Sequence, residues 1–90
     1  MVNPFKSMLD KKLEEYQIYP HAWNEKGFQY IKKLGPGSGY VIEGFQVDGK
    51  LLIRMYDPEL VAQAINFTDK EIDLIAGIAK NWRRYYGSIR

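Results

Sequence analysis

The sequence predicts an α+β domain with an N-terminal helix, a three-stranded antiparallel meander and a C-terminal helical pair. Its 90 residues fit one domain, residues 1–90. Apolar residues make up 46% of the chain and charged residues 27%, which is the composition of a globular protein. The hydrophobic spacing is helical at the start, alternating in the middle and helical again at the end, and this order predicts the class.

Asn3 and Pro4 predict the start of the first helix. Asn is a favoured N-cap, and Pro suits the first helical position, where the backbone N–H has no partner to lose. Apolar residues follow at helical spacing, namely Phe5, Met8, Leu9, Leu13 and Tyr16. Pro20 limits the helix, and Tyr19 before it is biased toward extended geometry. His21, the single histidine, is expected in a turn.

Residues 24–34 have two interpretations. In one, Asn24 caps a helix that ends at Gly35. In the other, Phe28, Tyr30 and Leu34 lie on one face of a strand. We take the strand as the first of the meander and leave the helix open. The glycine-rich segment 35–39 then predicts a flexible connection, because it lacks the lysine of a phosphate-binding loop and a strand follows it.

Residues 40–56 predict a β-hairpin around Asp48-Gly49. This dipeptide readily supplies the two positive φ angles of a type I′ turn. A two-residue loop sets Val47 opposite Lys50, Phe45 opposite Leu52, and Glu43 opposite Arg54. The last match of opposite charges supports the register. The more apolar face is expected to meet the helices and carries Tyr40, Ile42, Gln46, Leu51, Ile53 and Met55.

Two helices are expected to close the chain. The first would span 57–66, since it opens with an N-cap Asp, a Pro and a Glu. Thr68 and Glu71 predict a capping box for the second, with Phe67 and Ile72 at hydrophobic-staple spacing. Its main apolar stripe is expected to contain Ile72, Ile75, Ala79, Trp82 and Tyr86.

The end of the last helix is basic and aromatic, and no acidic residue follows Asp73. Trp, Tyr and Arg are the residue types favoured at the centre of protein interfaces. We therefore predict a partner-binding surface at Lys80, Trp82, Arg83, Arg84, Tyr85 and Arg90. The competing explanation is structural, since basic residues offset the helix dipole and Trp82 belongs to the inward stripe.

The segment 26–32 supports a nucleic-acid alternative. On a strand, Lys26, Phe28, Tyr30 and Lys32 would share one face, with rings to stack on bases and amines to meet phosphates. The segment echoes the RNA-binding strand of RRM domains, but Gln29 stands where that motif has a small residue. The net charge of +2 is a weak field, so we expect no appreciable nucleic-acid binding at physiological salt.

No catalytic centre is recognisable in the sequence. His21 has no nucleophile-elbow pattern to serve, and the absence of cysteine excludes thiolate metal sites. A calcium loop starting at Asp69 would need Gly and Glu where Leu74 and Lys80 stand. We expect no metal, no cofactor and no enzymatic activity.

The leading functional hypothesis is a small non-catalytic binding protein: an adaptor, inhibitor or regulator that acts through a macromolecular surface. A protein partner is expected, and self-association falls within this class; nucleic-acid binding is the alternative. We expect a cytoplasmic location without membrane contact. Charges interrupt the N-terminal apolar stretch, no apolar run approaches the ~20 residues of a membrane span, and cysteine is absent.

Overall fold

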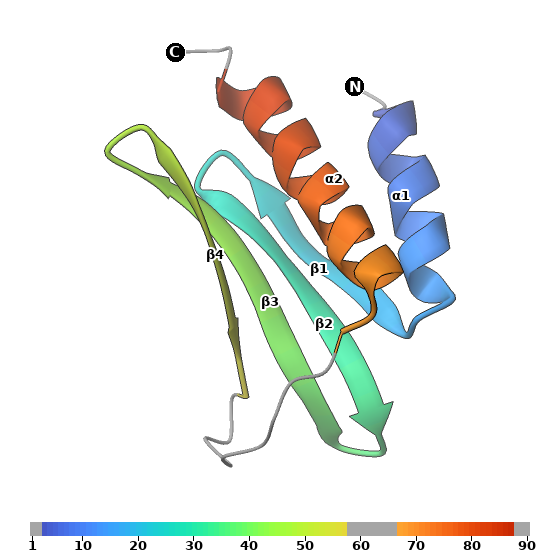
Figure 1. The fold of residues 1–90 in the computed structure, drawn as a ribbon. Helices are drawn as coiled ribbons and strands as arrows, with labels where there is room; N and C mark the ends of the chain where they lie inside the picture. Colours follow the sequence, from blue (N-terminus) through green and yellow to red (C-terminus); the bar gives the residue numbers. More distant parts are fainter. Residues whose placement is uncertain (1–2, 58–66, 88–90) are drawn as a thin grey trace.

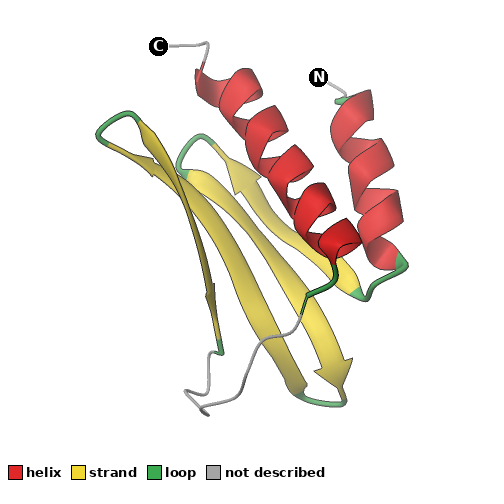
Figure 2. Cartoon of the chain, viewed as in Figure 1, coloured by secondary structure: helices red, strands yellow, loops and turns green. Residues whose placement is uncertain are grey.

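The computed structural model describes residues 3–57 and 67–87. Its elements in chain order are α1 (Pro4–Glu14), β1 (Ile18–Asn24), β2 (Gly27–Gly35), β3 (Ser38–Val47), β4 (Lys50–Tyr56) and α2 (Asp69–Gly87). The four strands form one antiparallel sheet in the order β1-β2-β3-β4. Both helices lie side by side over one face of it (Figures 1 and 2). The α+β class is confirmed; the helix expected over 57–66 lies outside the described residues, apart from Asp57.

The sheet has four strands where three were expected, because residues 18–24 form the edge strand β1. The expected turn at His21 is instead a β-bulge between Pro20 and Ala22. Proline is tolerated there because an edge strand leaves some N–H groups without a ladder partner. Gln17 turns the chain from α1 into β1 with φ 60°, and its carbonyl accepts a 2.8 Å hydrogen bond from the backbone N–H of Lys33.

The strand interpretation of residues 24–34 is confirmed by β2. Asn24 caps the β1–β2 turn, since its side-chain oxygen accepts a 2.9 Å hydrogen bond from the backbone N–H of Lys26. The β3–β4 hairpin is confirmed with its predicted register. Asp48 and Gly49 have φ of 51° and 76°, as a type I′ turn requires.

The helix caps also form as predicted. The Asn3 side chain accepts a 3.1 Å hydrogen bond from the backbone N–H of Lys6. At α2, the hydroxyl of Thr68 accepts a 3.2 Å bond from the Glu71 N–H, and the Glu71 carboxylate accepts a 3.1 Å bond from the Thr68 N–H. Neither described helix has the length and apolar character needed to cross a membrane.

The core lies between the sheet and the two helices. Its buried apolar residues are Leu9, Leu13, Ile18, Phe28, Tyr30, Ile42, Ile75, Ile78, Ala79 and Trp82. The expected stripe of α2 is shifted at its start, because Glu71 is buried while Ile72 is 50% exposed. Glu71 faces β2, where it forms an ion pair with Lys32. The buried stripe of α2 therefore begins at a charged residue, which a search for apolar spacing misses.

The predicted apolar face of the hairpin meets the helices only in part. Tyr40 and Ile42 on β3 are buried, and Leu51 and Met55 on β4 pack against the core. Ile53, however, is 41% exposed. β4 is the edge strand farther from α1, with β2 and β3 between it and β1 (Figure 1).

Candidate functional site

The first candidate surface is the face of the sheet turned away from the helices. Side chains alternate along a strand, so the neighbours of the buried Phe28, Tyr30 and Ile42 point to this opposite face. We call it the open face. It carries Tyr19 and Ala22 from β1, Gln29, Ile31 and Lys33 from β2, Val41, Glu43 and Phe45 from β3, and Leu52, Arg54 and Tyr56 from β4. No described helix covers it (Figures 1 and 2).

One apolar row crosses the whole open face. Tyr19 pairs with Ile31, Ile31 with Val41, and Val41 with Tyr56, so each strand contributes one residue. Directly opposed residues bring their side chains into contact distance across a sheet. The four residues are partly exposed. They form an apolar row with an aromatic side chain at each end.

A polar row lies beside the apolar one. The Gln29 amide donates to the Glu43 carboxylate at 2.8 Å, and the Arg54 guanidinium donates to its other oxygen at 2.5 and 3.1 Å. The hydrogen bond from Gln29, and then those from Arg54, hold the pKa of Glu43 below its usual value, against the opposing effect of burial. The carboxylate is therefore ionised and neutralised by its neighbours.

Two cations of the open face lie over aromatic rings. The Arg54 guanidinium is 5.7 Å from the ring centre of Phe45 and 5.2 Å from that of Tyr56. The Lys33 ammonium is 5.4 Å from the ring centre of Tyr19. Such cation–π contacts stabilise a pair by about 0.5–1 kcal/mol at exposed sites. They also restrict long side chains that would otherwise sample many rotamers.

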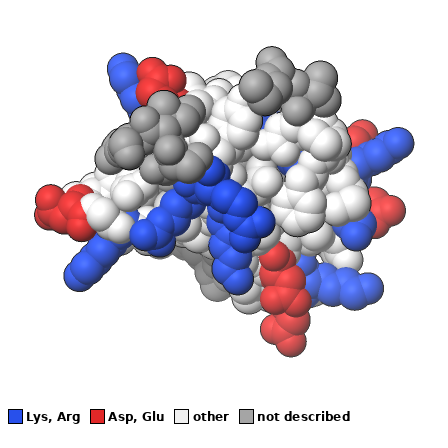
Figure 3. Space-filling view, turned by 90° about the horizontal axis from the view of Figure 1, so that it is seen from above, with Lys and Arg blue, Asp and Glu red and all other residues white. Residues whose placement is uncertain are grey.

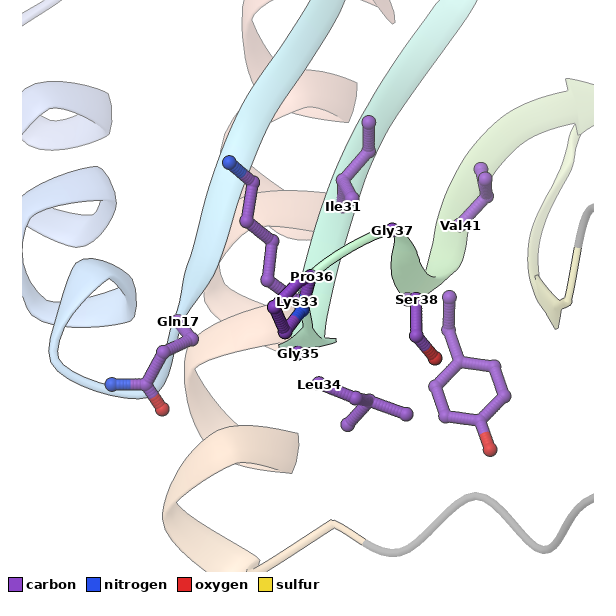
Figure 4. Close-up of a pocket in the computed structure, with 11 residues that line it drawn as sticks. Gln17, Ile31, Lys33, Leu34, Gly35, Pro36, Gly37, Ser38 and Val41 are labelled. Atoms are coloured by element: carbon purple, nitrogen blue, oxygen red, sulfur yellow. The ribbon is translucent and has the colours of Figure 1, made fainter.

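Two hollows are found along the open face. One of about 480 Å³ lies where Ala22 and Gly27 leave little side-chain volume, beside Phe45 and Arg54. Another of about 780 Å³ lies at the β2–β3 turn, next to Ile31 and Val41 (Figure 4). The flexible connection expected over 35–39 is instead a tight turn, because Gly35 ends β2, Ser38 and Gly39 begin β3, and only Pro36 and Gly37 lie between them. The whole segment lines the second hollow. The turn therefore presents no helix N-terminus to a phosphate.

In the predicted surface on α2 the cations are exposed, but Trp82 is buried. Trp82 is 1% exposed, and its indole N–H donates to the Asn24 carbonyl at 2.8 Å. Lys80, Arg83 and Arg84 are exposed, whereas Tyr85 is half-buried. Arg83 also donates to the Gly49 carbonyl at 3.1 Å, and Tyr85 contacts the Tyr86 ring.

Figure 3 looks onto the end of the molecule where α2 finishes. Lys and Arg side chains gather near the middle of this view, with acidic side chains toward its rim. Arg90, the last member of the predicted surface, lies outside the described residues. What α2 offers a partner is therefore mainly positive charge, without an exposed Trp.

Three residues of the nucleic-acid alternative, Phe28, Tyr30 and Lys32, share one face of β2, but that face is turned to the helices, and Lys26 lies in the β1–β2 turn. Phe28 and Tyr30 are 1% and 2% exposed, so neither ring can stack on a base. Lys32 is paired with Glu71, and only Lys26 is exposed. The predicted alternation of side chains along β2 is correct. The helices cover the face that carries Phe28 and Tyr30, so these rings are buried.

Tyr30 has a structural role in this core. Its hydroxyl donates to the Asp10 carboxylate, which also accepts from Lys6 at 2.5 Å. Burial, followed by the hydrogen bond to Asp10, raises the pKa of Tyr30 far above its ordinary value. The phenol is therefore neutral, and it ties β2 to α1.

Among residues 3–57 and 67–87, no group of three or more His, Asp or Glu side chains is placed to hold a metal ion. In comparisons with known proteins, no family model matches the chain, and no curated protein or solved structure matches it significantly.

Proposed function

We propose that this chain is a small non-catalytic binding protein, an adaptor, inhibitor or regulator, that holds a protein partner on the open face of its sheet. The observation that carries this proposal is the apolar row from Tyr19 to Tyr56, which crosses all four strands. In the described part of the chain no element covers it. A contiguous apolar patch on a surface often marks an interaction site.

The physical chemistry of the open face suits a protein partner. Covering apolar surface contributes about 25 cal/mol per Å² removed from water. Tyr and Arg are enriched among the residues that dominate interface energies, and both types are present here. Because Arg54 already lies against Phe45 and Tyr56, less rotamer freedom is lost when a partner orders it. The two hollows offer places for a partner's larger side chains.

One observation favours the second candidate, single-stranded nucleic acid. The open face carries three aromatic rings, Tyr19, Phe45 and Tyr56, together with the cations Lys33 and Arg54. Rings on a strand surface can stack on bases while cations meet phosphates. The Glu43 carboxylate is paired with Arg54 and so reduces the positive charge that this face offers to phosphates, and we therefore rank a protein partner first.

The basic end of α2 is the other place at which the same function could reside. Lys80, Arg83 and Arg84 are exposed there, with Tyr85 beside them. Its helix lies on the opposite side of the sheet from the open face (Figure 1). A partner seated on one surface therefore leaves the other uncovered, and the two sites are separable by mutation.

Capture with a matched pair of variants tests the proposal. Val41→Lys places a charge in the middle of the apolar row, and Asp73→Lys makes the same side chain at an exposed position of α2. Wild type and both variants would be immobilised on a support and incubated with extract from the source cells. Bound protein and bound nucleic acid would be identified separately. Thermal melts would confirm that both variants fold.

We expect wild type and Asp73→Lys to capture the same set of proteins. Val41→Lys should capture about tenfold less of them, or less still, because a bound partner would remove the new lysine from water at a cost of about 1.4 kcal/mol or more. A nucleic-acid partner would behave differently, because an added cation does not weaken phosphate binding. Equal capture by all three chains would contradict the assignment of the open face.

A further inference from the structure

The two edges of the sheet differ in how well they resist pairing with another strand. β1 contains Pro20 and a bulge beside it, and it contacts α1. Proline, bulges and covering elements are the usual means of protecting an edge. β4 pairs with β3 from Lys50 to Tyr56 without a register shift. Between Lys50 and Tyr56 there is no proline, and no described strand pairs with its outer side.

β4 carries an exposed apolar side chain on each face of the sheet, beside the cations Lys50 and Arg54 on the open face. Leu52 on the open face is 44% exposed, and Ile53 on the helix face is 41% exposed. A regular edge strand of seven residues with exposed apolar side chains on both faces is a site at which sheets can join.

We propose that β4 pairs antiparallel with β4 of a second copy of this chain, across a two-fold axis perpendicular to the sheet. The two sheets would then form one continuous sheet. This inference concerns the edge of the sheet and does not depend on what binds the open face.

The backbone of β4 supplies the donors and acceptors for this pairing. A two-residue hairpin closes on a hydrogen-bonded pair, here Val47 with Lys50, and such pairs alternate along the ladder. The N–H and C=O groups of Leu51, Ile53 and Met55 therefore point away from β3. With Ile53 opposite its own copy, Leu51 stands opposite Met55, and about six hydrogen bonds form.

Charge selects this register over its neighbours. With Ile53 at the axis, Lys50 faces Tyr56 of the copy, and Leu52 faces Arg54. Moving the axis to Leu52 sets Lys50 opposite Arg54, and moving it to Arg54 sets two arginines opposite each other. Like charges directly opposed across strands are destabilising.

Registers with the axis between residues are excluded, because they would place the helix-face residues of one strand on the open face of the other. The register centred on Ile53 is therefore the only one that pairs the whole strand and leaves no cation facing a cation. A closed two-fold contact requires such self-complementarity.

A charge-swap experiment tests the proposal. Ile53→Lys would set two cations opposite each other at the axis, whereas an equimolar mixture of Ile53→Lys and Ile53→Glu would set a cation opposite a carboxylate. Ile72→Lys is the control, since Ile72 is also exposed, at 50%, and lies on α2. Sedimentation would be measured from ~10 µM to ~1 mM, because an interface between two short strands is small.

We expect wild type and Ile72→Lys to dimerise equally and Ile53→Lys to dimerise about tenfold or more weakly. The mixture should recover the wild-type affinity as a heterodimer. A wild type that stays monomeric throughout, an Ile53→Lys variant that dimerises like wild type, or a mixture that does not recover would each overturn the proposal.

A single-cysteine variant gives a second readout that does not require a charged residue at position 53. The chain contains no cysteine, so Ile53→Cys can form only an intermolecular disulfide. Residues opposed in a hydrogen-bonded antiparallel pair have Cα atoms about 5.5 Å apart, within the range a disulfide spans. Ile53→Cys should oxidise to a dimer faster than Ile72→Cys, and equal rates would overturn the proposed axis.

Discussion

Lys32 on β2 and Glu71 on α2 form an ion pair with little exposure to water, their side chains being 14% and 5% exposed. Glu71 also completes the capping box with Thr68, so one carboxylate both caps α2 and attaches it to the sheet. Lys32 further lies 5.4 Å from the ring centre of Phe67, the residue before that cap.

Replacing Glu71 with Gln should destabilise the fold by about 3 kcal/mol, because it leaves the Lys32 ammonium buried without its counter-charge. Lys32→Met, which removes the opposite charge, tests the same contact from the sheet side. Urea unfolding of both variants measures the loss. A change below about 0.5 kcal/mol would show that the pair is solvated.

The same pair predicts a dependence of stability on pH. Burial raises the pKa of Glu71, but hydrogen bonds from Lys32 and Thr68 outweigh it and leave the pKa below the ordinary 4.5. A lowered carboxyl pKa stabilises the fold above the unfolded-state value, and this contribution is lost as pH falls through the folded-state value. Wild type should therefore lose more stability than Glu71→Gln below pH 4.5.

Gly44→Ala should be strongly destabilising. A Cβ at this position would lie 2.1 Å from an atom of the Phe28 ring, which packs directly on the β3 backbone. Phe28 is 1% exposed and is enclosed by Tyr30 and Trp82, so it cannot move aside cheaply. We expect a loss of at least about 2 kcal/mol by urea unfolding. Gly35→Ala is the control, because its Cβ would meet nothing within 4 Å.

Gly49→Val should cost more than about 1 kcal/mol, since a β-branched residue strongly disfavours the φ of 76° found there. Gly49→Asn, which tolerates positive φ, should cost less. Thermal melts of the two variants measure the difference. An unchanged midpoint in Gly49→Val would mean that the type I′ turn is not needed for folding.

Trp82→Ala should cost about 3–5 kcal/mol, which a domain of this size is not expected to survive at growth temperature. Trp82→Phe keeps most of the ring and removes the donor to the Asn24 carbonyl. That variant should lose about 1–3 kcal/mol, the cost of an unpaired buried acceptor. Comparing their unfolding free energies separates packing from hydrogen bonding. Wild-type stability in Trp82→Ala would place this side chain on the surface.

The features predicted correctly from the sequence depend on residues close together in the chain. Asn3 with Pro4, Asp48 with Gly49, and Thr68 with Glu71 each determine a cap or turn within a few residues. The hairpin register follows from the turn length alone. The helical stripe of α2, also a local pattern, places Trp82 in the core, and this burial removes Trp82 from the predicted partner-binding surface.

The features that were missed depend on contacts between distant elements. Pro20 alone predicts the end of a helix followed by a turn. Only the pairing of residues 18–24 with β2 shows that they form an edge strand. Glu71 is buried and Ile72 is exposed, the reverse of the expectation, because Glu71 pairs with Lys32 on β2. The open face was not foreseen, since its apolar row from Tyr19 to Tyr56 forms only when the register of all four strands is known. No local spacing connects those residues.

The central claim, that the open face is the binding surface, is tested most directly by site-specific photo-crosslinking in the source cells. A photoreactive side chain would replace Val41 on the open face, Lys80 on the basic end of α2, or Asp73 as the control. We predict a discrete protein adduct from position 41 and none from positions 80 and 73. An adduct from position 80 with none from position 41 would contradict the claim and move the binding surface to α2.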